Sequence, residues 1–270
     1  MIPVSVVVRT RDEEEHIVDV LRLLSEQSVT PSEVIIVNNY STYARLVSFE
    51  DKMKKLSRLF KRTKTRFRLV SFPDRDFSHP YSTNLGIFFA DNELVAITNA
   101  HSLPLSRSWL GSGLSHFEDH GVASVTGYSY PFEKKRTLQK VGQYVYHFSE
   151  RILLRFNWTS TIDCILRRSL WQAYPFDENL PHIIPTAKAY GCEDYDWSKE
   201  MEARGFKICV DPRFSVFHSH ESGLKEARRN IKNYMTQRAI LQTIDRFKRP
   251  RRAFTTLDQI KEPDVRTVEC

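Results

Sequence analysis

The chain has 270 residues, of which 41% are hydrophobic and 27% are charged, and its formal net charge is +7. This length suffices for the core of one α/β domain but would cramp two full domains. No run approaches the roughly 18 apolar residues of a membrane span, which argues against a membrane-spanning class. The positive charge suits an anionic partner: a nucleotide, a nucleic acid or an anionic lipid surface.

The N-terminus and the cysteines indicate a reducing compartment. Residues 1–8 lack a basic leader and a cleavage site, so we interpret them as a first strand and not as a signal peptide. The four cysteines show no CxxC spacing, and a chain of this length needs no disulfide staples. We therefore expect reduced thiols and a cytoplasmic protein.

The first half alternates short β-rich runs with helical patterns. The predicted strands cover residues 4–8, 33–37, 67–72 and 94–98, and the predicted helices cover residues 13–27, 42–61 and 84–90. Such alternation favours parallel strands joined by right-handed crossovers. Ligands of these sheets bind at the carboxyl ends of the strands, so candidate site residues are sought there.

The second half is less regular. Predicted strands cover residues 122–128, 163–167 and 206–210, and predicted helices cover residues 138–156, 194–204 and 224–247, followed by a tail at 249–270. We expect a domain at 1–223, with a nucleotide-binding half at 1–104 and a catalytic and acceptor half at 105–223. Residues 224–270 would form a C-terminal basic amphipathic helix and tail.

Polar side chains follow two of the predicted strands in the first half. Asn38 follows strand 33–37, where its amide could bind a nucleobase edge, although an Asn-rich turn explains it as well. Asn99 and His101 follow strand 94–98, and residues two apart in an extended chain point to one side. Such a pair could hold a cation between two phosphates, with the imidazole favouring manganese or zinc over magnesium; the alternative is a turn with a capping histidine.

Two patterns in the second half could also carry chemistry. Glu193, Asp194 and Asp196 stand at a predicted helix start, where a carboxylate is either an N-cap or a group kept ionised to act as a general base. His218 and His220 have strand spacing and face the same way, which suits either a metal or diphosphate site or surface polar structure.

The order of these signals resembles family 2 glycosyltransferases with the GT-A fold, most closely the rhamnosyltransferase-like branch. The matching segments are VSVVVRTRDE (4–13), PSEVIIVNNYST (31–42), FSH (77–79), TNLG (83–86), TNAHSLP (98–104), PFDE (175–178), EDYDW (193–197), GF (205–206) and HSH (218–220). The resemblance implies a Rossmann-like, mainly parallel central sheet flanked by helices.

The resemblance also implies residue roles. Asp194 matches the catalytic base, with Glu193 beside it. The nucleotide-sugar-binding residues would be Arg9, Thr10, Glu13, Asn38, Asn84 and Asn99, and the metal ligands would be His101, His218 and His220. Asn38 stands where the family usually has an aspartate, and Asn99 with His101 replaces the acidic DxD metal motif. The implied cofactor is a divalent cation, manganese or magnesium.

The expected function is therefore transfer of a hexosyl or deoxyhexosyl group, with inversion, from a UDP- or dTDP-sugar. The acceptor hydroxyl would belong to a glycan, a lipid-linked molecule or a protein, in polysaccharide or glycoconjugate biosynthesis. The alternatives are a nucleotide-sugar-binding pseudoenzyme or regulatory subunit, favoured by the neutral Asn38 and Asn99, and a nucleotidyltransferase, disfavoured by the lack of an early Gly-rich loop. Nucleic-acid binding is disfavoured because no such motif accompanies the basic stretches.

The C-terminal segment suggests a peripheral contact with an anionic membrane. Ten basic residues lie between residues 225 and 252, against the two acids Glu226 and Asp245. Basic groups near an anionic leaflet contribute about 1 kcal/mol each, so a few suffice for reversible attachment. We expect the contact at residues 246–252, while the apolar face of the helix packs on the catalytic domain.

Overall fold

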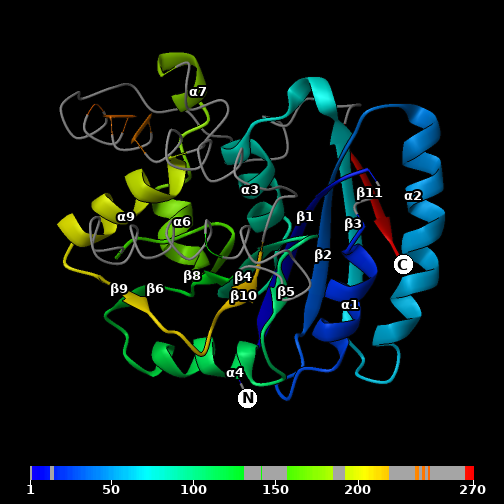
Figure 1. Cartoon of the computed structure of the whole chain (residues 1–270), viewed down its shortest axis with the longest axis horizontal. Coiled ribbons are helices and arrows are strands. Elements are labelled where there is room, and N and C mark those ends of the chain that lie inside the picture. Colours follow the sequence, from blue (N-terminus) through cyan, green and yellow to red (C-terminus); the bar gives the residue numbers. More distant parts are fainter. Residues whose placement is uncertain are drawn as a thin grey trace.

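The computed structural model describes residues 2–12, 15–130, 141, 157–184, 192–218, 235–236, 239–240, 243 and 265–270. Within this part of the chain, a central sheet has the strand order β11-β3-β2-β1-β4-β8-β6-β9 (Figure 1). Its strands are β1 (Val4–Arg11), β2 (Glu33–Tyr40), β3 (Arg66–Pro73), β4 (Leu94–Asn99), β6 (Val122–Thr126), β8 (Asp163–Arg167), β9 (Lys207–Val210) and β11 (Arg266–Glu269).

The first half is the parallel unit that the sequence predicts. β3, β2, β1 and β4 pair in parallel, with Arg9 opposite both Val37 and Asn99 in the register. β8 is antiparallel to β4 and to β6, and β9 returns parallel to β6. The carboxyl ends of β1, β2 and β4 therefore meet at one edge, while the amino end of β8 reaches the same edge from the other direction.

Alternating side chains of the strands pack on two helical layers. Val4, Val6 and Val8 face one layer, and Val7 faces the other, because successive side chains of a strand point to opposite faces. The first layer contains α1 (Ile17–Ser25), α2 (Tyr43–Leu56), η1 (Ser57–Phe60), α4 (Trp109–Leu114) and η3 (Ser115–Glu118). The second contains α3 (His79–Phe88), α6 (Arg168–Ala173) and α9 (Glu193–Ala203). The remaining short helices are η2 (Asp74–Asp76) and α7 (Leu180–Ile183).

A small second sheet joins segments that are distant in sequence. β5 (Leu103–Pro104) pairs antiparallel with β10 (Val216–Phe217), which pairs in parallel with β7 (Ser129–Tyr130). Because β5 begins just after residue 101 and β10 ends just before residue 218, this sheet carries two of the predicted metal-binding histidines to one place.

Several predicted boundaries shift for local reasons. α3 begins at His79, five residues before the predicted start, because Ser78 caps it and Pro80 suits the first turn. The second helix ends at Leu56 and continues as the 3₁₀ turn η1. β6 ends at Thr126, since the backbone of Phe214 lies so close to Gly127 that a side chain there would clash.

The last residues form a strand and not the end of a tail. β11 pairs antiparallel with β3, and Arg68 Nε binds Glu269 Oε1 at 2.6 Å. Arg266 Nε lies 2.8 Å from Glu50 Oε1 of α2, so the strand is also tied to a helix. Figure 1 shows β11 beside β3, at the α2 end of the molecule.

Most of the predicted helices 138–156 and 224–247, and most of the segment 249–270, lie outside the described residues; residues 141, 235–236, 239–240 and 243, which are described, are helical. Among the residues that are described, no helix is both long and apolar enough to cross a membrane.

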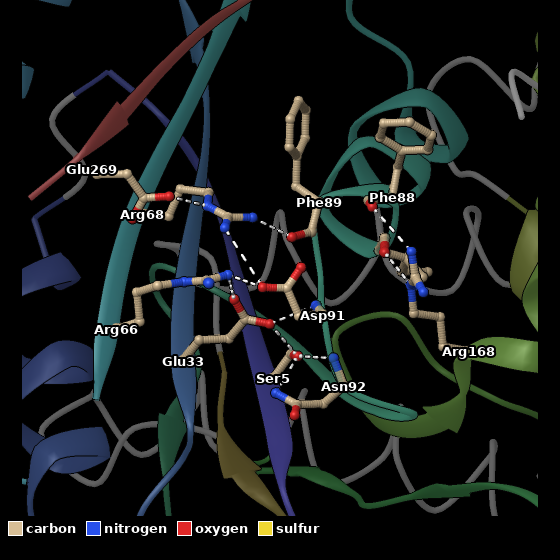
Figure 2. Close-up of polar contacts among 11 residues, drawn as sticks. Ser5, Glu33, Arg66, Arg68, Phe88, Phe89, Asp91, Asn92, Arg168 and Glu269 are labelled. Atoms are coloured by element: carbon tan, nitrogen blue, oxygen red, sulfur yellow. Dashed lines mark hydrogen bonds and ion pairs between the residues drawn. The ribbon is translucent and has the colours of Figure 1, made fainter. Parts of the chain in front are cut away.

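An ionic network around the buried Glu33 joins strands at the amino end of the sheet, with Arg66 and Asp91 on its exposed side (Figure 2). Glu33 is 2% exposed and accepts hydrogen bonds from Ser5 Oγ at 2.6 Å, from Asp91 N at 2.7 Å and from Arg66 Nη2 at 2.8 Å. Arg66 also pairs with Asp91, and Asn92 donates to Ser5. This network joins β1, β2, β3 and the turn before β4, at the end of the sheet opposite to the carboxyl edge of these strands.

Candidate functional site

The carboxyl edge of β1 places Arg9 beside the start of α9. The Arg9 guanidinium donates through Nη1 to Thr83 Oγ1 of α3 at 2.7 Å. Through Nη2 it donates to the Thr161 carbonyl oxygen at 2.8 Å and to Thr161 Oγ1 at 3.4 Å. One side chain of β1 thereby ties α3 to the segment that precedes β8.

Asp194 lies against the same Thr161. Asp194 Oδ2 accepts the Thr161 N–H at 3.2 Å, and Asp194 Oδ1 accepts the N–H of Tyr195 at 2.8 Å. The helix N-cap is Cys192, whose φ of 89° is left-handed, so the alternative in which Asp194 caps the helix is wrong. Asp194 stands in the first turn, and its carboxylate is held by two backbone donors.

Glu193 has different surroundings from its neighbour. Its side chain is 2% exposed, and Oε2 has no hydrogen-bond partner within the described part of the chain. Burial, and then the charge of Asp194, raises the pKa of Glu193 from 4.5 to about 8, while Arg9 opposes the rise. The site therefore favours a neutral Glu193 at neutral pH.

The pKa of Asp194 is raised as well, by burial, so a helix-start position alone does not keep this group ionised. The rise is opposed by the N–H groups of Thr161 and Tyr195 and by the Arg9 charge. Because hydrogen bonds to a carboxylate favour its charged form, the contacts of Asp194 favour its anion more than those of Glu193 do.

The predicted nucleoside-binding residues separate onto two faces of the sheet. Arg9 faces α3 and α9, whereas Thr10 and Asn38 face the α1 and α2 layer. Thr10 Oγ1, both polar atoms of the Asn38 side chain, Ser71 Oγ and Thr98 Oγ1 are buried there without a partner in the described residues. These atoms form a polar patch at the carboxyl ends of four neighbouring strands. Glu13 lies outside the described residues.

Asn39, which the sequence reasoning passed over, lies on the Arg9 face of the sheet. Its Nδ2 donates to Asp74 Oδ1 at 2.7 Å, and Arg11 also pairs with Asp74. Nearby, Asp12 has a φ of 47° and accepts both Ser41 N–H at 3.0 Å and Ser41 Oγ–H at 2.6 Å. The period-2 alternation of strand 33–37, extended two residues, would have distinguished Asn39 from Asn38.

Asn84 is fully engaged in the protein interior. Its Nδ2 donates to the Phe176 carbonyl at 2.8 Å and to Glu178 Oε1 at 2.7 Å, while its Oδ1 accepts from Trp171 Nε1 and from Phe176 N. Since these four bonds use the hydrogen-bonding capacity of the amide, we leave Asn84 out of the proposed donor site.

The predicted metal residues come together in part. The rings of His101 and His218 lie with centroids 4.6 Å apart, and His218 Nδ1 is 2.9 Å from Ser102 Oγ. Asn99 lies next to Arg9 in the sheet register, two residues before His101. His220 lies outside the described residues. In the part of the chain that is described, no group of three or more His, Cys, Asp or Glu side chains forms a metal cluster.

His79, part of the FSH segment, belongs to the surroundings of Arg9. Burial, and then the Arg9 charge, lowers the pKa of His79 from 6.5 to about 4. The imidazole is therefore neutral at neutral pH, and the guanidinium is the positive charge on this side of the carboxylate pair.

Comparison with known proteins gives a family and a fold. The family model described as Glycosyl transferase family 2 matches residues 5–171. A search of the curated proteins finds no match.

Three solved structures illustrate the likeness of fold. The mannosyltransferase PcManGT from Pyrobaculum calidifontis, in complex with GDP-Man and Mn²⁺, has a TM-score of 0.64 at 18% identity over 92% of this chain and 65% of its own. S. aureus TarS has a TM-score of 0.55 at 17% identity over 88% of this chain and 39% of its own. Glucosyl-3-phosphoglycerate synthase from Mycobacterium tuberculosis has a TM-score of 0.53 at 14% identity over 87% of this chain and 79% of its own. The chain thus spans less than two thirds of the length of the first two.

Proposed function

Because the chain belongs to glycosyl transferase family 2 and has the GT-A fold, we propose that it transfers a sugar from a nucleotide-diphosphate sugar to an acceptor hydroxyl with inversion. Asp194 is the proposed general base. The glycosyltransferase class follows from the family; the mechanism, the residue roles and the substrates are our proposal.

The observation that carries the proposal is the setting of Asp194 at the carboxyl edge of the sheet. Its carboxylate is held by two backbone N–H groups and faces the charge of Arg9, whereas Glu193 is buried and favours its neutral form. A general base needs a fixed position and an accessible anionic state. Asp194 would accept the acceptor hydroxyl proton while that oxygen displaces the nucleoside diphosphate from the opposite face of the anomeric carbon.

The leaving diphosphate requires positive charge or hydrogen-bond donors. His101 and His218, with His220 from outside the described residues, would hold a divalent cation, because imidazole nitrogens suit Mn²⁺ better than Mg²⁺. When bound, such an ion neutralises charge on the departing diphosphate. The lack of carboxylates in this group predicts a weaker site than an acidic DxD provides.

The proposed donor is a UDP- or dTDP-sugar. The solved structures of the fold include a TarS complex with UDP-GlcNAc and a glucosyl-3-phosphoglycerate synthase complex with UDP and Mn²⁺, which supports the class of donor. The buried polar atoms of Thr10 and Asn38 lie together on one face at the strand ends and are the groups that could bind a base. The proposed acceptor is a glycan, a lipid-linked molecule or a protein.

Substitution of the proposed base tests the mechanism. Asp194→Asn is expected to reduce transfer by about 10²–10⁴-fold, because a general base typically contributes that factor, while donor binding measured by calorimetry stays near wild type. Glu200→Gln, on the same helix and in an exposed pair with Arg204, is the matched control and should stay active.

Two outcomes would contradict this assignment. Full turnover of Asp194→Asn would remove Asp194 as the base, and loss of activity in Glu193→Gln alone would transfer the role to Glu193. Donor binding without transfer or donor hydrolysis in the wild type would instead favour the nucleotide-sugar-binding pseudoenzyme.

A further inference from the structure

The Thr161 peptide lies between Arg9 and Asp194. Its carbonyl and hydroxyl oxygens accept from the guanidinium at 2.8 and 3.4 Å, and its N–H donates to the Asp194 carboxylate at 3.2 Å. Thr161 itself is 5% exposed, so its backbone is confined on both sides by protein. The geometry makes Thr161 a bridge through which a side chain of β1 acts on the first turn of α9.

Arg9 is confined at its other nitrogen as well. Nη1 donates to Thr83 Oγ1 at 2.7 Å, and the Thr83 side chain is fully buried. Bonds to three oxygens from two different elements leave the guanidinium little freedom, and its planar fork matches this arrangement better than the single point charge of a lysine would. These contacts orient Arg9 toward the protein, although the sequence alone placed it in the nucleoside pocket.

The charge of Arg9 bears on most of the titratable groups around the carboxylate pair; the exception is the buried Asp163 of β8, whose pKa is raised well above 3.8 by burial, against the hydrogen bond from Trp109. The Arg9 charge lowers the pKa of Glu193 and Asp194 from α9 and of His79 from α3. Cys164 of β8 is buried, and its pKa is raised well above 9.0 by burial and the nearby carboxylates, so the thiol stays neutral. Arg9 therefore supplies the positive charge that opposes burial of the pair.

We propose that Arg9 is a positioning residue: it holds Asp194 in place through Thr161, and its positive charge stabilises the anionic form of the neighbouring carboxylates. This inference rests on the proposed role of Asp194. Arg9 is not assigned contact with the donor or the acceptor. Without the guanidinium, Thr161 loses a hydrogen bond at its carbonyl oxygen and another at its hydroxyl, and the carboxylate pair loses the positive charge of Arg9.

The test compares Arg9→Met, which removes the charge, with Arg9→Lys, which keeps it but lacks the fork. The control is Arg107→Met, which breaks an exposed pair with Glu26 far along the chain from the site. Titration of carboxyl carbons by ¹³C NMR, assigned with Asp194→Asn and Glu193→Gln, reads the pair directly and needs no activity. The pH profile of kcat/KM and the dissociation constant of the donor are measured on the same proteins.

In Arg9→Met, the first deprotonation of the pair is expected to move to higher pH by about 1 unit or more, since an opposite charge at close range shifts a carboxyl by about 1–3 units. The acid limb of kcat/KM should move with it, and kcat should fall by more than donor affinity. Arg9→Lys should restore most of the titration but only part of kcat, and Arg107→Met should match the wild type. If Arg9→Met does not fold, Arg9→Lys decides the question: its carboxyl titration should stay close to that of the wild type, while its kcat falls.

An unchanged carboxyl titration in Arg9→Met would overturn the inference, and so would a loss confined to donor affinity, which would make Arg9 a donor ligand. An inactive wild type whose carboxyl titration still depends on Arg9 would count against the proposed function and leave the electrostatic role of Arg9 in place. An active wild type whose carboxyl titration does not depend on Arg9 would overturn the role of Arg9 and leave the proposed function in place.

Discussion

Glu193 and Asp194 are adjacent in the chain but differ in what touches their oxygens. Asp194 accepts two backbone N–H groups, whereas Glu193 Oε2 is buried without a partner in the described residues. Residue type and spacing cannot separate these two carboxylates, since the difference comes from Thr161, a residue 33 positions away. Which of the two carboxyls favours its charged form is therefore decided by its surroundings.

The raised pKa of Glu193 predicts a pH-dependent stability. Its pKa is about 8 in the folded protein against 4.5 as the ordinary value, so the folded state binds the proton more tightly. The contribution of Glu193 to stability is then full below about pH 4.5 and is lost progressively as the pH rises toward 8, with a slope of up to about 1.4 kcal/mol per pH unit. Glu193→Gln is expected to show a flatter decline in the free energy of unfolding between pH 5 and pH 9, measured in urea. Parallel declines in wild type and variant would contradict the buried, neutral Glu193.

The histidine pair predicts a metal preference. The nucleoside diphosphate is expected to raise the Tm of the protein more when Mn²⁺ is present than when Mg²⁺ is present, because imidazole nitrogens suit the softer ion. His101→Ala should lower the affinity for Mn²⁺ about 100-fold or more, because substitution of groups that only support a metal ligand already costs about 10–100-fold in affinity. His120→Ala, at an exposed histidine, is the control. Equal stabilisation by the nucleotide in excess chelator would show that diphosphate binding needs no metal.

At the scale of elements, the C-terminal strand illustrates how a weak local pattern becomes ordered structure. β11 has four residues and a mostly exposed surface, yet it pairs with β3 and is held by ion pairs to Arg68 and Glu50. It covers the edge of β3, which would otherwise present unpaired backbone groups. Local sequence could not show this pairing, because its partner lies about 200 residues earlier.

Deletion of residues 265–270 is therefore expected to destabilise the protein. Each backbone hydrogen bond contributes about 0.5–1.5 kcal/mol net, so the free energy of unfolding should fall by about 2–4 kcal/mol in urea denaturation. Glu269→Gln, which breaks only the exposed pair with Arg68, should cost about 1 kcal/mol or less. A deletion that costs no more than the single substitution would mean that β11 contributes little to stability.

At the scale of the whole molecule, the sheet divides the chain into two chemical environments. Arg9 and the carboxylates of α9 lie on one face, while Thr10 and Asn38 lie on the other with their polar atoms buried. We propose a third functional region in the basic C-terminal segment, most of which lies outside the described residues. Its ten basic residues against two acids predict attachment to anionic surfaces.

Co-sedimentation with vesicles tests this attachment. Weak, salt-sensitive binding to anionic vesicles and no binding to neutral ones is expected, because the attraction is electrostatic and is screened by salt. Replacement of Arg249, Arg251 and Arg252 by Gln should abolish binding, while Arg107→Met should not alter it. Equal binding to both kinds of vesicle, or none at low salt, would remove the membrane role.

The sequence by itself determined the parallel pairing of the first four strands, the helices between them and the positions of the polar residues at the strand ends. These features follow from periodicity and turn chemistry, which act over a few residues. Tertiary structure alone decided which of those residues meet: Arg9 with Thr161 and Asp194, His101 with His218, and Asn84 with the interior. The physical reason is that burial, hydrogen-bond partners and local charge are properties of contacts between distant segments, and such contacts exist only once the sheet has brought the strand ends together.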